Sequence, residues 1–216
     1  IYTLSELAHA NLSKVSSLAT ATATRLQAQA AIQLASRGKE KPLFEILATD
    51  SGKGLSALPP KSELDVYFDI EGHPRVDGGL EYLWGVSYED SSASQGKAYA
   101  FRDWWAHTQE QEKQAFEGFI DWIYDRWKQD SAMHVYHYAS YEITAITKLV
   151  SRERTRQEQT KELLEAGVFI DLYKIVKSGL LIGEPKYSIK NVEHLYRDTR
   201  TTAVANGGES VEVYER

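Results

Sequence analysis

Apolar residues along the chain follow two different periods, and the change falls near residue 64. Up to residue 37 they recur at helical spacing, and the Ala-, Gln- and Leu-rich run 19–35 has a high helix propensity. From residue 64 onward the period is two, which is typical of half-buried strands. Strands are predicted at 64–72, 82–88 and 97–102, with polar turns between them. Their short connections predict an antiparallel meander.

The second half of the chain alternates between the two periods. An amphipathic helix is predicted over 110–127, because its apolar residues fall on one face that needs a sheet to bury against. It is followed by a strand at 132–138, a helix at 140–150, a charged connection at 151–160, a strand at 167–172 and a helix at 189–196. Because a helix precedes the strand at 132–138, this strand can lie parallel to the first one.

Together these elements predict an α/β fold in which a three-stranded antiparallel meander is followed by parallel strands with helices. The order β-β-β-α-β-α-β-α resembles that of the ribonuclease H-like mixed sheet. Residues 61–216 are predicted to form this domain, and residues 1–60 a helical N-terminal segment with a linker that Gly52, Gly54 and Pro59 mark. A helical cap on the main core is the alternative for the first 60 residues.

The ends of the chain suggest a piece of a longer protein. The sequence begins with Ile1 rather than Met and stops shortly after the strand-like segment 211–214. We therefore expect the ribonuclease H-like domain to be truncated at its C-terminus.

Composition narrows the class of protein. A chain of 216 residues, of which 42% are hydrophobic, can bury the core of one domain with an appendage. It has no Cys, which excludes disulfides and thiolate metal sites. The sequence shows no signal peptide and no apolar run of membrane-spanning length, so we expect no membrane contact and a cytoplasmic location.

The charge of the chain is negative but uneven. A net charge of −6 argues against a protein that coats nucleic acid nonspecifically. Residues 143–200 nevertheless carry a net charge of +3, and the remainder carries −9. This pattern allows a basic wall beside an acidic cleft, although solvated helix faces explain it equally well.

Two acids on the first predicted strand are the strongest chemical signal. Alternation puts Phe68 and Ile70 on one face of the strand and Asp69 and Glu71 on the other. Asp is depleted in strands and like charges on one face repel, so the arrangement costs stability unless a cation lies between the carboxylates. A divalent metal ion is the obvious candidate. Gly72, directly after the acids, would let a substrate backbone come close.

Phosphoryl transfer on a polynucleotide would explain such a pair. It uses two hard cations about 3.5–4 Å apart, one for the attacking water and one for the leaving oxygen. These ions take oxygen ligands, so further carboxylates should converge from neighbouring elements. Glu142, in the first turn of the helix after the fourth strand, is the candidate for the third ligand. Alternatively, it complements the helix dipole.

The two acid-bearing segments resemble motifs of a known superfamily. Residues 66–72 resemble the first motif, Asp-x-Glu, of the DEDD exonucleases of the DnaQ-like type, and residues 137–142 resemble the second motif. Together with residues 80–86, they are most similar to the predicted RecB-type nucleases (YprB-like), which carry a ribonuclease H-like domain and are sometimes fused to a helicase. The resemblance implies two Mg²⁺ or Mn²⁺ ions held by Asp69, Glu71 and Glu142.

Two departures from the superfamily pattern stand out. The second motif ends in Glu142, where most of these enzymes have Asp, so the carboxylate lies one methylene further out. The third motif, a Tyr or His followed a few residues later by Asp, is not found after Tyr196. That motif would supply the general base and a fourth carboxylate, so we expect an incomplete site in this sequence.

Further candidates have weaker support. Asp171 is a possible additional metal ligand, but an Asp between a strand and a helix is more often a cap. His73 is a candidate substrate contact or a turn residue. His137 is a candidate substrate contact; three residues from His134 on a strand, it lies on the opposite face, which argues against a shared zinc ion.

The remaining candidates are basic and aromatic. Lys186 and Lys190 flank Ser188 at a predicted helix start, where they bind phosphate or form a solvated face. Trp104 and Trp105 are able to stack on bases, although adjacent Trp residues near a sheet edge more often serve the core.

Three functions follow, in order of preference. The first is a metal-dependent nuclease that resembles a 3′–5′ exonuclease, acts on nucleic acid, with DNA preferred over RNA, and has a fused or associated helicase. The second is a ribonuclease H-like nucleic-acid-binding module that has lost catalysis and serves a larger helicase or repair protein. The third is a glycosidase, whose carboxylates would stand about 5–9.5 Å apart across a sugar cleft. Nothing in the sequence indicates a saccharide platform.

Overall fold

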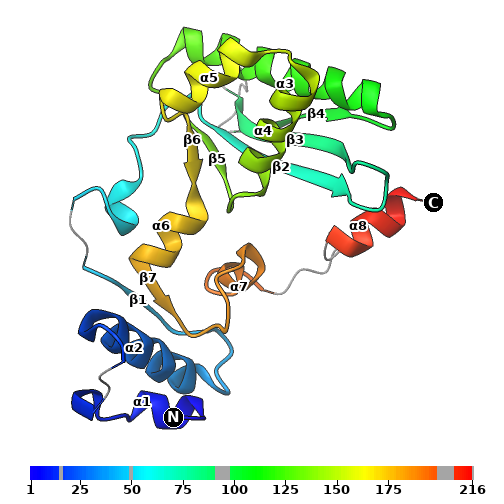
Figure 1. Ribbon diagram of the computed structural model, residues 1–216. Helices are drawn as coiled ribbons and strands as arrows, with labels where there is room; N and C mark the ends of the chain where they lie inside the picture. The colour runs from blue at the N-terminus through cyan, green and yellow to red at the C-terminus, as the bar shows by residue number, and fades with distance from the viewer. Residues whose placement is uncertain (15–16, 49–50, 91–97, 199–206, 216) are drawn as a thin grey trace. The chain divides into compact units, whose positions relative to one another are not determined.

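The computed structural model describes residues 1–14, 17–48, 51–90, 98–198 and 207–215. Two compact units make up the chain (Figure 1). Unit 1 comprises Ile1–Leu58 and Tyr173–Arg200, and unit 2 comprises Pro59–Leu172 and Thr201–Arg216. The predicted division at residue 60 follows the sequence alone, whereas the contacts also bring Tyr173–Arg200 into unit 1.

Unit 2 is built on a five-stranded mixed sheet. Its strands are β2 (Val66–His73), β3 (Leu80–Asp90), β4 (Ala98–Trp105), β5 (Val135–His137) and β6 (Phe169–Asp171). The order across the sheet is β4-β3-β2-β5-β6, in which β2, β3 and β4 are antiparallel neighbours and β2, β5 and β6 are parallel ones. The predicted α/β fold is confirmed. Lys97, the first residue of the predicted third strand, lies outside the described residues.

Three helices of unit 2 contribute apolar side chains to the core on this sheet: α3 (Gln109–Gln129), α4 (Tyr141–Glu153) and α5 (Gln157–Glu165), of which α5 packs on α3. Thr108 caps α3, because its hydroxyl accepts a hydrogen bond from the Gln111 N–H. At the centre of the core, the rings of Phe68 and Phe119 stack with centroids 4.2 Å apart. This face of β2 is therefore apolar and closed.

Two predictions about unit 2 are wrong. The charged segment 151–160 is not a mere connection, since α4 runs on to Glu153 and α5 begins at Gln157. Leu163 of α5 is buried in the core. The sequence did not reveal this helix because it has few apolar residues among many charged ones. The strand-like segment 211–214 belongs instead to helix α8 (Gly207–Tyr214), which packs on the sheet because Tyr214 stacks on Tyr82.

Unit 1 contains helices and a small sheet. Its elements are α1 (Leu4–Ala8), η1 (Leu12–Lys14), α2 (Thr20–Ser36), β1 (Phe44–Ile46), η2 (Gly54–Ala57), most of α6 (Leu172–Gly179), β7 (Leu180–Ile182) and α7 (Ile189–Glu193). Strand β1 pairs antiparallel with β7. The segment predicted as a linker thus contains a strand and a 3₁₀ turn. All three β1 residues are exposed, so no alternation of buried and exposed residues marks this strand. It is a strand because it pairs with β7.

Candidate functional site

Strand β2 presents its two acids on the face opposite the core. Phe68 and Ile70 are buried, whereas Asp69 is exposed and Glu71 half-buried. The Ile70 N–H donates a 3.0 Å hydrogen bond to Asp69 Oδ1. The alternation predicted from the sequence is confirmed, and the central position of β2 in the sheet places both carboxylates in the middle of unit 2.

Glu142 approaches this pair from helix α4, which follows the neighbouring strand β5. Strand β5 pairs in parallel with the first residues of β2, and α4 begins a few residues after β5 ends. The pKa of Asp69 is raised to about 6 by burial, by the negative charges of Glu142 and Glu71, and by a hydrogen bond to Glu142. The three acids therefore lie close enough to repel one another. Because Asp69 keeps an exposed surface, a ligand can reach the group even though the protein shields part of it from water.

Glu142 is buried without a matching donor. Only 3% of its surface is exposed, and within the part of the chain that the structure describes its Oε2 has no hydrogen-bond partner. The Nδ1 atom of His137 lies 3.5 Å away and also has no hydrogen-bond partner among those residues. A buried carboxylate oxygen without a donor is costly, so this position favours a cation.

The oxygen-rich donor set suits hard divalent cations such as Mg²⁺ or Mn²⁺. Among the described residues, however, no group of three or more His, Asp or Glu side chains is arranged to hold a metal ion. The side chains of Asp69 and Glu142 instead lie within hydrogen-bonding reach of each other. The residues fit a metal site by their chemistry, while the ligand positions are not those of a formed coordination sphere.

A tyrosine and a glutamate complete the surroundings of the acids. Tyr141 Oη donates a 2.8 Å hydrogen bond to Glu81 Oε2. The pKa of Tyr141 is raised by burial, by this hydrogen bond and by the charges of Glu81, Glu71 and Glu142. Both groups lie over Gly72, where an added Cβ would collide with Tyr141 Oη and Glu81 Oε2. The glycine thus makes room for these two side chains.

Neither Tyr141 nor Glu81 was among the residues predicted for the site. A signal for them existed, since Tyr141 directly precedes Glu142 and Glu81 lies in the segment 80–86 that resembles the RecB-type nucleases. The bulge between Glu71 and Gly72, which aligns Gly72 with Glu81, is a feature of the folded pair of strands that no periodicity reveals.

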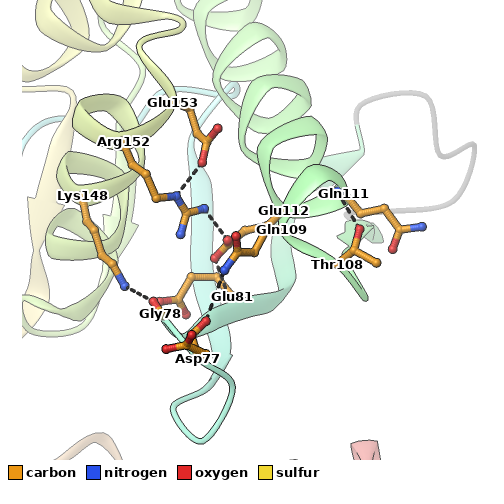
Figure 2. Close-up of polar contacts among 10 residues, drawn as sticks. All are labelled: Asp77, Gly78, Glu81, Thr108, Gln109, Gln111, Glu112, Lys148, Arg152 and Glu153. Carbon is orange, nitrogen blue, oxygen red and sulfur yellow. Dashed lines mark hydrogen bonds and ion pairs between the residues drawn. The ribbon is translucent and has the colours of Figure 1, made fainter.

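A polar network that includes Glu81 connects helices α3 and α4 to the loop between β2 and β3 and to the start of β3 (Figure 2). Glu112 on α3 accepts hydrogen bonds from the Glu81 N–H at 2.7 Å and from Arg152 Nη2 at 2.5 Å. Lys148 on α4 donates to the Gly78 carbonyl at 2.8 Å. Helices α3 and α4 are therefore tied to the loop and to the start of β3, the strand that carries Glu81.

The other predicted residues have varied surroundings. Asp171 Oδ1 accepts a 3.0 Å hydrogen bond from the Ala139 N–H, and Ala139 has a φ of 73° in the turn before α4. Asp171 thus stabilises the turn that delivers Glu142. His73 is buried beside α8, with Nε2 2.8 Å from Glu215 Oε1. Its imidazole holds the C-terminal helix against the end of β2.

The predicted basic and indole contacts lie elsewhere. Lys186 and Lys190 are exposed in unit 1, where the Ser188 hydroxyl caps α7 by accepting from the Asn191 N–H, as predicted. In unit 2, Trp104 packs edge-on against the core residue Phe119, whereas Trp105 is exposed. The structure therefore brings Asp69, Glu71 and Glu142 together in unit 2, with His137 beside Glu142. Lys186 and Lys190 belong to unit 1 instead.

A mixed sheet in this order, with two acids on its central strand and a third in the first turn of the helix that follows the neighbouring strand, defines a ribonuclease H-like domain. The family model RNase_H_2, of the RNase H superfamily, matches residues 66–216, and the chain belongs to this family. No curated protein and no solved structure matched the chain. Membership indicates a nuclease-like domain that interacts with nucleic acid. Within the described ranges, no helix is long and apolar enough to cross a membrane.

Proposed function

We propose that this domain is a metal-dependent nuclease of the DEDD type that hydrolyses phosphodiester bonds from the 3′ end. The observation that carries the proposal is the convergence of Asp69, Glu71 and Glu142, where burial and the charges of the two neighbouring acids raise the pKa of Asp69 to about 6. An accessible acid whose pKa is raised by burial and by like charges is typical of sites that bind cations or reacting groups. Membership of the RNase H superfamily supports nucleic acid as the substrate.

The three carboxylates would hold two Mg²⁺ or Mn²⁺ ions, with Asp171 nearby as a further ligand or a support. When bound, such ions activate a water molecule and stabilise the leaving oxygen. The protein's own part is positional. Asp171 fixes the turn before α4 through Ala139, and the Tyr141 hydrogen bond to Glu81 fixes the first turn of α4 against β3. Both contacts set where Glu142 stands relative to Asp69.

The substrate and the partner are proposed from the resemblance to the RecB-type nucleases. We infer that the substrate is DNA rather than RNA, and that a fused or associated helicase domain delivers a strand to the site. His137 would stand close to that strand because its imidazole lies beside Glu142.

A binding module without catalysis is the second candidate. One observation favours it: among the described residues, no group of side chains forms a coordination sphere for a metal ion. In this case the acids would be a remnant of the fold, and nucleic acid would bind without being cleaved.

The experiment that separates the two candidates is a cleavage assay on the full-length protein. Single-stranded DNA and RNA labelled at either end are incubated with Mg²⁺ or Mn²⁺, and the variants Asp69→Asn and Glu142→Gln are compared with wild type. Asp103→Asn is the matched control, because Asp103 lies on β4 in the same row as Asp69, with Gly85 between them. The nuclease proposal expects shortening from the 3′ end that both site variants lose and the control keeps.

Calorimetric titration with Mn²⁺ provides a second readout on the same proteins. Wild type and Asp103→Asn should bind Mn²⁺, and Asp69→Asn should bind it more weakly by at least tenfold. Cleavage that survives in Asp69→Asn would contradict the catalytic assignment. Binding of DNA without cleavage and without any Mn²⁺ affinity would favour the binding module.

A further inference from the structure

Unit 1 contains an open groove whose charged lining residues are all basic. It lies between α2 and α6, has a volume of about 510 Å³, and is lined by Arg25, Tyr173, Lys174, Lys177 and Ser178. The side chains of Arg25, Lys174 and Lys177 supply three positive charges, and no acid is among the lining residues. This contrasts with the chain as a whole, whose net charge is −6.

Contacts within unit 1 fix two of these cations. The Arg25 guanidinium donates to the carbonyls of Lys177 and Leu180, just where α6 ends. A cation at a helix C-terminus is stabilised by the helix dipole, so Arg25 joins α2 to α6. The Lys177 ammonium lies 5.2 Å from the centroid of the Tyr173 ring, in a cation–π contact.

The positive field extends beyond the groove. The Tyr187 hydroxyl donates hydrogen bonds near the end of α6, and burial raises its pKa. The charges of Arg25 and Lys177 oppose that rise. Two of the groove's cations therefore act on the same neighbour, as expected if they form one local region of positive potential.

We propose that this groove binds the phosphate backbone of a nucleic acid strand. Three cations that line one groove match a row of phosphates, and Lys and Arg contacts to phosphates supply most of the sequence-independent affinity of nucleic-acid-binding proteins. The open form of the groove suits a chain that passes through it, and Tyr173 adds an aromatic side chain to its lining, on which a base can stack. The proposal rests on the proposed function for the identity of the ligand, but it does not depend on catalysis.

The test measures the salt dependence of binding in the full-length protein. A fluorescent oligothymidylate is titrated by anisotropy in EDTA, so that no cleavage occurs, over a range of NaCl concentrations. The double variant Lys174→Gln, Lys177→Gln should bind more weakly. The slope of log K, the association constant, against log salt is negative, and the variant should reduce its magnitude by about 1.4. This is about 0.7 for each single-strand phosphate that a lysine no longer neutralises.

Two controls isolate the groove from net charge. The double variant Lys39→Gln, Lys161→Gln removes the same charge from exposed lysines outside the groove and should leave the slope near that of wild type. The double variant Lys174→Arg, Lys177→Arg keeps the charges and should also keep the slope. Thermal melts verify that all variants are folded.

The outcomes separate this inference from the proposed function. An unchanged slope in the Lys→Gln groove variant, or an equal decrease in the control, would overturn the inference. So would binding of phosphatidylserine vesicles through these lysines with no effect on the oligonucleotide. If the lysine-dependent slope is found in a protein that cleaves nothing with Mg²⁺ or Mn²⁺, the groove stands and the nuclease proposal fails. If Asp69→Asn abolishes cleavage but keeps the slope, both stand.

Discussion

Unit 2 contains two groups of buried acids that differ in what surrounds them. Glu112 and Glu142 are almost equally buried, with 2% and 3% of their surface exposed. Glu112 meets the Arg152 guanidinium at 2.5 Å and a backbone N–H at 2.7 Å. Glu142 faces Asp69, and its Oε2 has no hydrogen-bond partner among the described residues.

Equal burial thus hides opposite electrostatics. Around Glu112 the charge is balanced and the donors are in place, as in a structural ion pair. Glu142 instead faces another acid, and burial together with the charges of Glu142 and Glu71 raises the pKa of Asp69. Burial alone does not distinguish the two acids, but their partners do. Glu112 has the partners of a residue that stabilises the fold, whereas Glu142 has the surroundings of a ligand-binding residue.

The largest effect is expected where the balanced group is broken. Arg152→Met leaves the buried Glu112 carboxylate without its cation, and the loss of one partner of such a pair costs about 3 kcal/mol of unfolding free energy. Urea denaturation followed by circular dichroism measures this cost. The double variant Arg152→Met, Glu112→Gln removes the stranded charge and should recover a large part of the loss. A single variant as stable as wild type would show that Glu112 and Arg152 do not form a structural pair.

A smaller loss of stability is expected from a substitution at Gly72, over which Tyr141 and Glu81 form their hydrogen bond. Gly72→Ala places a methyl group against Tyr141 Oη and Glu81 Oε2, so the hydrogen bond between them must break or β2 must shift. Overpacking of this kind costs about 2 kcal/mol. It should also weaken Mn²⁺ binding, because Tyr141 precedes Glu142.

Gly85→Ala is the matched control for this substitution. Gly85 lies opposite Asp69 on β3, and an added Cβ there would stand 3.0 Å from the far end of the exposed Phe101 side chain, so a change of rotamer there can relieve the contact. We therefore expect a loss of stability well below that of Gly72→Ala. Equal losses at both glycines would contradict the role assigned to the Tyr141 and Glu81 pair.

Much of this site could be predicted from the sequence because it depends on local periodicity. Alternation along β2 separated Asp69 and Glu71 from the core, and the order of elements placed the strand before Glu142 beside β2. The position of Glu81 could not be predicted in the same way, because it depends on a bulge at Gly72 and on the register of β3. The partner of Glu112 was equally hidden, since Arg152 lies 40 residues away on another helix.

The fold shows the same limit. The segment 211–214 has the pattern of a strand because Val211 and Val213 alternate with Glu212 and Tyr214. Its helical form is stabilised by tertiary contacts, in which Tyr214 stacks on Tyr82 and Glu215 pairs with His73. Strand β1 is likewise defined by a partner, β7, that lies more than 130 residues further along the chain. Elements of this kind follow from long-range contacts, which local patterns do not contain.

The smallest effect, and the one of opposite sign, is expected at Asp69. Its pKa is about 6 in the folded protein and 3.8 as an ordinary value, so the folded state holds a proton that the unfolded state releases. The group therefore contributes full stability below pH 4, and this contribution is lost as the pH rises through 6. Since Asp69 is more than a third exposed, water reduces the cost at pH 7 to about 1 kcal/mol.

Asp69→Asn should remove this pH dependence and reverse the usual sign of a substitution. At pH 7 the variant should be more stable than wild type by about 1 kcal/mol, and near pH 4 the two should coincide, because the protonated Asp and the Asn are both neutral. Urea midpoints at both pH values measure the difference, in which contributions of the other carboxylates cancel. Mn²⁺ at pH 7 should stabilise wild type but not the variant, since the cation replaces the proton between the acids. A variant that is less stable than wild type at pH 7 would mean that Asp69 belongs with Glu112, among the acids that hold the fold together.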